Sequence, residues 1–139
     1  FGKPVIGICS QGGTVKNNIG GRTITEEQWK PFIENHDAVY VSLDYKGDDP
    51  SFCRSYHMAT RSADYDDTAS LVAALDCVVG VVTTALHLAD GLGVKAYHLV
   101  PDRHTWKFAG GIPPYETATF IHQNGKDWKE VLANVKIDF

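Results

Sequence analysis

Short apolar runs alternate with polar turns and with segments of helical periodicity along the whole chain. Most of these apolar runs are rich in β-branched residues, which is typical of strands buried on both faces of a sheet. Two shorter runs carry a weaker form of the same pattern. We therefore expect six strands, at Val5–Ser10, Ala38–Leu43, Tyr56–Thr60, Cys77–Val82, Lys95–Val100 and Phe120–His122.

Segments with helical spacing of apolar residues separate most of these strands. Thr25 and Gln28 have the spacing of a capping box, which predicts a helix that begins there and continues through Ile33. Pro31 fits such a helix only within its first turns. Three more helices are expected, one with Asp66 and Asp67 as caps, one from Thr84 to Leu92 that Gly93 closes, and one over Asp127–Val135.

Strands that alternate with helices predict an α/β fold, namely a Rossmann-like, doubly wound parallel sheet. The 139 residues suffice for one domain with its own core, and no repeat or linker interrupts them, so we expect a single domain over residues 1–139. Ligands of such sheets bind beyond the carboxyl ends of the strands, where the strand order reverses. The loop after the first strand and the turn after the fourth would flank that point.

The turn after the fourth strand carries the strongest indication of a binding site. Thr83 and Thr84 open a short apolar helix directly beyond a buried strand, so hydroxyls and free backbone N–H groups converge on one point. His87 lies three positions after Thr84 on the same helix face. A helix N-terminus disfavours imidazolium, so a neutral His87 would donate a hydrogen bond to a phosphate or sugar oxygen. The alternative is a capping threonine and a histidine packed on a core helix.

Other candidate residues follow the first two strands. Gln11, Gly12 and Gly13 form a loop whose backbone could approach a phosphate, although a plain turn explains it as well. Arg22 could fold over the same crevice or be a solvated loop charge. Asp44 ends the second strand, where an acidic residue often binds a ribose hydroxyl and where a turn-forming residue is equally expected.

Composition narrows the function classes. The formal net charge is −4 and no long basic run occurs, so we expect no nucleic-acid partner and no binding to anionic membranes by bulk charge. No apolar stretch approaches the ~20 residues of a membrane span. Neither Cys-x-x-Cys nor His-Glu-x-x-His occurs, so no metal is expected. Three cysteines, an odd number, indicate reduced thiols and a cytoplasmic protein. The chain begins with Phe1, so we expect a segment upstream.

Residues Asp66–Asp76, followed by Cys77–Ala89, resemble the C-terminal, donor-binding half of GT-B glycosyltransferases of the heptosyltransferase-like superfamily. The likeness is greatest to versions that follow tetratricopeptide repeats in bacterial proteins. Further agreement comes from Ile6-Gly7-Ile8 with the glycine loop, Arg22-Thr23-Ile24, Val41-Ser42-Leu43, and the ending from Tyr115 through Gln123 to Asp127-Trp128. The resemblance therefore spans nearly the whole chain.

The resemblance implies a nucleotide-sugar donor and no metal or other cofactor. The donor diphosphate would lie on Thr83, Thr84 and the helix N-terminus, with His87 close by. Arg22 matches a basic position that helps to hold phosphate, and the loop at Gln11 and Gly12 would close over it. Asp44 lies near where such enzymes hold the ribose, and Tyr65 near where they contact the base.

Two positions depart from the family pattern: Val82 stands where an acidic residue is common, and Asp90 where a small residue is usual. A GT-B enzyme also needs an N-terminal acceptor domain, so we expect such a domain or helical repeats as partners. The isolated chain is expected to transfer no sugar. The alternatives that remain open are a non-catalytic nucleotide or nucleotide-sugar binding module and a degenerate scaffold domain.

Overall fold

The computed structural model describes residues 2–10, 24–44, 50–56, 60, 64–81, 84–100 and 118–137; for Tyr65 and Thr84 it describes the backbone alone. The described residues form a six-stranded sheet in the order β3-β2-β1-β4-β5-β6. Every pair of neighbouring strands is parallel. The strands are β1 (Val5–Cys9), β2 (Val39–Ser42), β3 (Arg54–Ser55), β4 (Cys77–Val81), β5 (Lys95–Val100) and β6 (Ala118–His122).

The strand order confirms the predicted doubly wound fold. From β1 the chain moves outward through β2 to β3, and then returns to the other side of β1 to build β4, β5 and β6. β1 therefore lies between β2 and β4, with Gly7 in register with Val41 on one side and with Val78 on the other. The strand order reverses between β1 and β4, which is where ligands bind in sheets of this kind.

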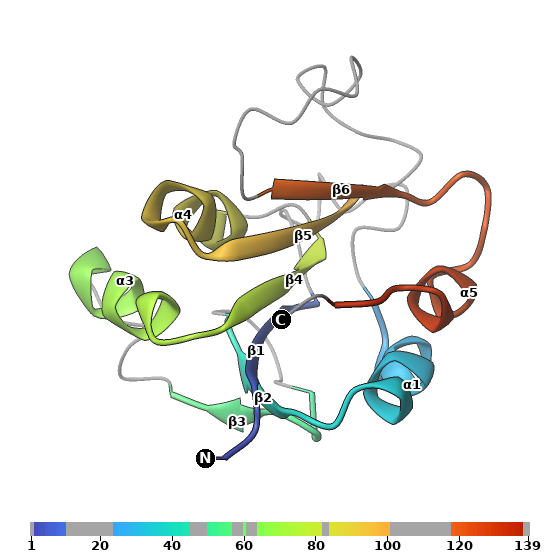
Figure 1. Cartoon of the computed structure of the whole chain (residues 1–139), viewed down its shortest axis with the longest axis horizontal. Coiled ribbons are helices and arrows are strands. Elements are labelled where there is room, and N and C mark those ends of the chain that lie inside the picture. The colour runs from blue at the N-terminus through green and yellow to red at the C-terminus, as the bar shows by residue number, and fades with distance from the viewer. Residues whose placement is uncertain are drawn as a thin grey trace.

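Four described helices cover the two faces of the sheet (Figure 1). On one face lie α1 (Glu26–Asn35) and α5 (Trp128–Ala133), and on the other lie α3 (Tyr65–Ala73) and α4 (Thr84–Leu92). Each face has its own apolar core, because successive side chains of a strand point to opposite faces. The larger core lies under α1 and α5 and contains Trp29, Phe32 and Trp128, and the smaller one under α3 and α4 contains Val72 and Leu86.

Helices α1 and α5 pack side by side and exchange polar contacts along their length. The Gln28 side chain donates to Asp127 Oδ1 over 3.0 Å near the starts of the helices, and the Asn35 side chain donates to the Ala133 carbonyl over 3.3 Å near their ends. Beyond α1, His36 Nδ1 lies 2.9 Å from the Phe32 carbonyl oxygen, and Ile137 N–H donates to His36 Nε2. These contacts fix the last described segment against the first helix.

The third strand was predicted wrongly. It lies at Arg54–Ser55, ahead of Tyr56–Thr60, and pairs with Val41 and Ser42 of β2. Tyr56 and Thr60 are not strand residues, and Thr60 N–H donates to the Tyr56 carbonyl; the rest of the predicted strand lies outside the described residues. Both residues of β3 are exposed at the sheet edge, so no apolar pattern marks the strand.

Helix ends differ from the predictions in small ways. Asp64 caps α3, accepting from Asp66 N–H, so Asp66 and Asp67 lie in the first turn and are not caps. Thr25 and Gln28 form the predicted capping box. Pro31 lies in the middle of α1 and removes one backbone donor there. Asp127 caps α5, which ends at Ala133, two residues before the predicted end.

Among the described residues, no helix combines the length and the apolar character needed to cross a bilayer. Cys9 and Cys77 are buried strand residues, as predicted, and Cys53 is half-buried; none of the three forms a disulfide in the structure. Burial raises the pKa of the Cys77 thiol to about 12, so this sulfur stays protonated at neutral pH.

Candidate functional site

The carboxyl ends of β1 and β4 meet where the strand order reverses. Cys9 at the end of β1 is in register with Gly80 near the end of β4. A Cβ at position 80 would overlap the backbone carbonyl oxygen of Cys9, so glycine allows this close approach. Helix α4 begins at Thr84, three residues after the last residue of β4. Its N-terminus therefore faces the same edge of the sheet as the end of β1.

Helix α4 has the bounds that the sequence predicts. It ends in a Schellman motif, with Gly93 at φ 76°, Val94 N–H donating to the Ala89 carbonyl and Gly93 N–H donating to the Asp90 carbonyl. Thr84 is its first residue, and His87 follows within the first turn and a half. The His87 side chain is half-buried, and its ring centroid lies 5.7 Å from that of His98 on β5. His87 therefore packs against the sheet beneath α4 and keeps part of its surface open.

Asp44 follows β2 at the same edge, as predicted, and is buried with 4% of its surface exposed. Its carboxylate accepts from the Ser10 backbone N–H over 3.1 Å and from the Ser10 hydroxyl over 2.6 Å. Ser10 directly follows β1, so this contact joins the ends of two neighbouring strands. The contact gives Asp44 a structural role at the candidate site, and hydrogen bonds to a carboxylate are among the stronger ones.

Asp90 and His98 form a buried pair of acidic and imidazole side chains next to His87. The Asp90 Oδ2 of α4 lies 2.8 Å from Nε2 of His98 on β5, and both side chains are fully buried. Asp90 Oδ1 has no hydrogen-bond partner in the part of the chain that the structure describes. Burial raises the pKa of the Asp90 carboxyl to about 6, and the nearby His87 opposes this rise. The His98 ring also packs edge-on against Phe120 of β6, with centroids 4.9 Å apart.

The structure brings three predicted site residues to the carboxyl edge of the sheet: the backbone of Thr84, the side chain of His87, and Asp44. Tyr65 is the first residue of α3, on the same side of the sheet as α4, and its side chain lies outside the described set. The remaining predicted residues, Gln11, Gly12, Gly13, Arg22 and Thr83, lie outside the described residues. The described part of the predicted site therefore consists of the ends of β1, β2 and β4 and of α4.

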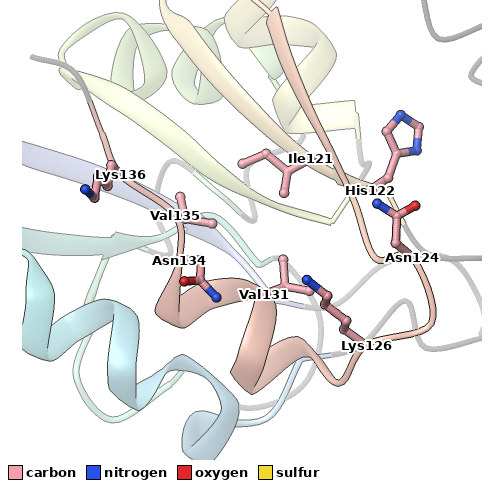
Figure 2. Close-up of a pocket in the computed structure, with 8 residues that line it drawn as sticks. All are labelled: Ile121, His122, Asn124, Lys126, Val131, Asn134, Val135 and Lys136. Atoms are coloured by element: carbon pink, nitrogen blue, oxygen red, sulfur yellow. The ribbon is translucent and has the colours of Figure 1, made fainter.

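A pocket of about 280 Å³ opens on the other face, between β6 and α5 (Figure 2). Ile121, Val131 and Val135 form its apolar side, and amide, imidazole and ammonium groups form the rest. None of the predicted site residues lines it. Within the described ranges, no group of three or more His, Cys, Asp or Glu side chains is arranged to hold a metal ion.

Comparison of the chain with protein-family models, with curated proteins and with solved structures gives no match. The glycosyltransferase resemblance therefore stays a prediction from the residues quoted for it.

Sequence reasoning missed the pairing of Asp90 with His98. Two signals were present: Asp90 interrupts an otherwise apolar helix at a position where the resembled family has a small residue, and His98 interrupts an apolar strand. A charged residue in each of two adjacent buried elements favours mutual pairing, because an unpaired buried charge is costly.

Proposed function

We propose that this domain binds the nucleoside diphosphate part of a nucleotide-sugar donor at the carboxyl edge between β1 and β4. One observation carries the proposal: the N-terminus of α4 begins directly beyond the strand end at which the strand order reverses. Parallel sheets bind ligands at this point, and free N–H groups at a helix start bind anions.

The first turns of the described helices support an anion at α4. Acidic side chains occupy the first turns of α1, α3 and α5, where they complement the positive end of each helix dipole. The first turn of α4 contains no acidic residue and holds threonine and alanine instead. In a domain of net charge −4, this local arrangement favours an anionic ligand at α4 over the other helix starts.

We propose the following contacts between the donor and the predicted site residues. The diphosphate oxygens accept from the N–H groups and threonine hydroxyls at the start of α4, and His87 donates from one turn further along. Arg22 and the loop at Gln11, Gly12 and Gly13 are proposed to hold the phosphates, as the glycosyltransferase resemblance implies. Ribose and base extend toward β2 and α3, where Asp44 and Tyr65 are the candidates.

Sugar transfer belongs to a complete enzyme in this proposal, in which an N-terminal acceptor domain or helical repeats supply the acceptor side. One feature favours a binding module that performs no transfer: Val82 stands where the resembled family commonly has an acidic residue close to the donor. The two forms of the proposal share the diphosphate site and differ in turnover.

An amide NMR titration with UDP, GDP and ADP tests the site. We expect the shifts to gather at residues 9–10, 80–81 and 84–88. Thr84→Val should weaken the binding, whereas Thr119→Val, at an exposed threonine of β6, is the matched control and should leave it unchanged. Shifts confined to β3 or to the pocket between β6 and α5, or no shifts at millimolar ligand, would overturn the proposal.

A further inference from the structure

The Asp90 carboxylate lies between two histidines. Its Oδ2 lies 2.8 Å from His98 Nε2, and a proton on His87, three residues earlier on α4, lowers the pKa of the Asp90 carboxyl. The two imidazole rings lie 5.7 Å apart at a tilt of 49°. Two of the three groups are fully buried, and His87 alone reaches the surface. Protonation of His87 therefore changes the electrostatic potential at the buried Asp90 and His98 side chains.

Among the side chains that the structure describes, the other titratable groups of the neighbouring elements belong to the opposite core or lie toward the surface. Helix α4 packs against α3, β4 and β5, and His98 also contacts Phe120 of β6. Cys77 and Tyr97 belong to the core on the opposite face of the sheet. The remaining titratable residues of these elements with described side chains are exposed or half-exposed: Asp64, Asp66 and Asp67 at the start of α3, Lys95 at the start of β5, and His122 at the end of β6.

We propose that Asp90, His98 and His87 form one proton-sharing unit, through which the diphosphate site takes up a proton from solvent as its anion binds. This inference rests on the proposed function. Asp90 and His98 act as positioning residues through His87, which is the member that touches the ligand.

The charges balance in two states. Without ligand, the Asp90 carboxyl is ionised above its pKa of about 6 and accepts from neutral His98, while His87 is neutral, so the unit carries one negative charge. The helix N-terminus opposes a proton on His87, and the buried carboxylate favours one. A bound diphosphate adds negative charge beside His87, so His87 accepts a proton from solvent and the unit becomes neutral. The resembled glycosyltransferases usually have a small residue at the position of Asp90, so this carboxylate is a departure from their pattern.

Two measurements on the whole chain test the unit. The first follows the ring signals of His87 by NMR as a function of pH in the ligand-free protein. We expect the His87 midpoint to fall by about half a pH unit or more in Asp90→Asn, because an opposite charge is lost. The double variant Asp90→Ala with His98→Leu removes the pair without leaving a buried partner, and should show the same fall. His36, on the opposite face of the sheet, is the internal control and should not change.

The second measurement is calorimetric titration with UDP-glucose in two buffers of different ionisation enthalpy. A diphosphate diester has no proton to exchange near neutral pH, so any proton taken up belongs to the protein. We expect an uptake of up to one proton and a Kd that rises by up to about tenfold per pH unit between pH 6 and 8. Both effects should diminish in the double variant.

The outcomes separate the two proposals. Binding without proton uptake, together with an unchanged His87 midpoint in both variants, overturns the proton-sharing unit and leaves the diphosphate site standing. If UDP-glucose, UDP, GDP and ADP all fail to bind, the diphosphate site is overturned, and the ligand-linked part of this inference falls with it. A lowered His87 midpoint in the variants would still establish the coupling of Asp90 to His87.

Discussion

We expect Gly80→Ala to lower the free energy of unfolding by about 3 kcal/mol, near the upper end of the range for overpacked positions. A Cβ at position 80 would overlap the carbonyl oxygen, the Cα and the Cβ of Cys9. Two of these atoms are backbone atoms of the central strand β1, which cannot rotate away as a flexible side chain can. β1 is hydrogen bonded to β2 as well as to β4, so a shift of Cys9 disturbs the pairing on both sides.

Two other glycines calibrate this value. A Cβ at Gly7 would lie 2.6 Å from Leu75 Cδ1 and 2.9 Å from Leu43 Cδ1, which are the ends of side chains that can turn, so Gly7→Ala should cost about 1–2 kcal/mol. A Cβ at Gly91 in α4 would meet nothing within 4 Å. Gly91→Ala should therefore stabilise the protein by about 0.5–1 kcal/mol, because alanine favours a helix over glycine.

Urea unfolding followed by tryptophan fluorescence measures all three variants, since Trp29 and Trp128 are buried in the core. At a common m-value, the midpoints should fall in the order Gly91→Ala, unchanged protein, Gly7→Ala, Gly80→Ala. If Gly80→Ala unfolds within about 0.5 kcal/mol of the unchanged protein, the close approach of β1 and β4 is not what requires glycine at this position.

Three further predictions concern the candidate site. Thr84→Val and His87→Ala should each weaken binding of a nucleoside diphosphate by roughly 1–3 kcal/mol in calorimetric titration; a large loss of melting temperature in His87→Ala with unchanged affinity would contradict the site. Burial raises the pKa of Asp90 to about 6 in the folded protein, above its value in the unfolded chain, so folding is more favourable when this carboxyl is protonated. As pH rises from about 4 to 7, the free energy of unfolding should therefore fall by about 1–3 kcal/mol relative to that of Asp90→Asn, measured in melts of both proteins. Stability curves of the two proteins that run parallel across this pH range would refute the prediction. Asp44→Ala should cost about 1–3 kcal/mol by leaving Ser10 N–H without its acceptor, and combining it with Ser10→Ala should cost less than the sum of the two single variants in denaturant unfolding; additive losses would show that the two residues do not interact.

The elements that the sequence predicts best are those whose local signals agree. β5 and α4 have the bounds expected from their patterns, because β5 is an apolar run that is buried along nearly its whole length and α4 ends at a glycine with positive φ. The strand at Arg54–Ser55 could not be found in this way, because it exists only through pairing with β2 and buries neither side chain. Local periodicity reports burial, so it is silent on a short exposed edge strand.

In the candidate site, too, the sequence predicts local features and misses contacts between different elements. The start of α4 beyond a buried strand is a local feature, and the sequence places it correctly. The contacts of Asp44 with Ser10 and of Asp90 with His98 join different elements, and their partners depend on strand order and register. A sequence shows that Asp90 is unusual in an apolar helix, and only the packing of α4 on β5 shows which group it meets.

The pairing of α1 with α5 has a consequence for the order in which the chain acquires its structure during synthesis. Contacts between these helices span 98 and 99 residues of sequence, and Trp29 and Phe32 share their core with Trp128 and Leu132. Until residues 128–133 have left the ribosome, the aromatic side of α1 lacks this cover. The described residues of the core under α3 and α4 lie no later than about position 96, so this face can close earlier. A nascent chain halted before α5 would therefore present a finished face and an unfinished one, and the unfinished face is where a chaperone would bind.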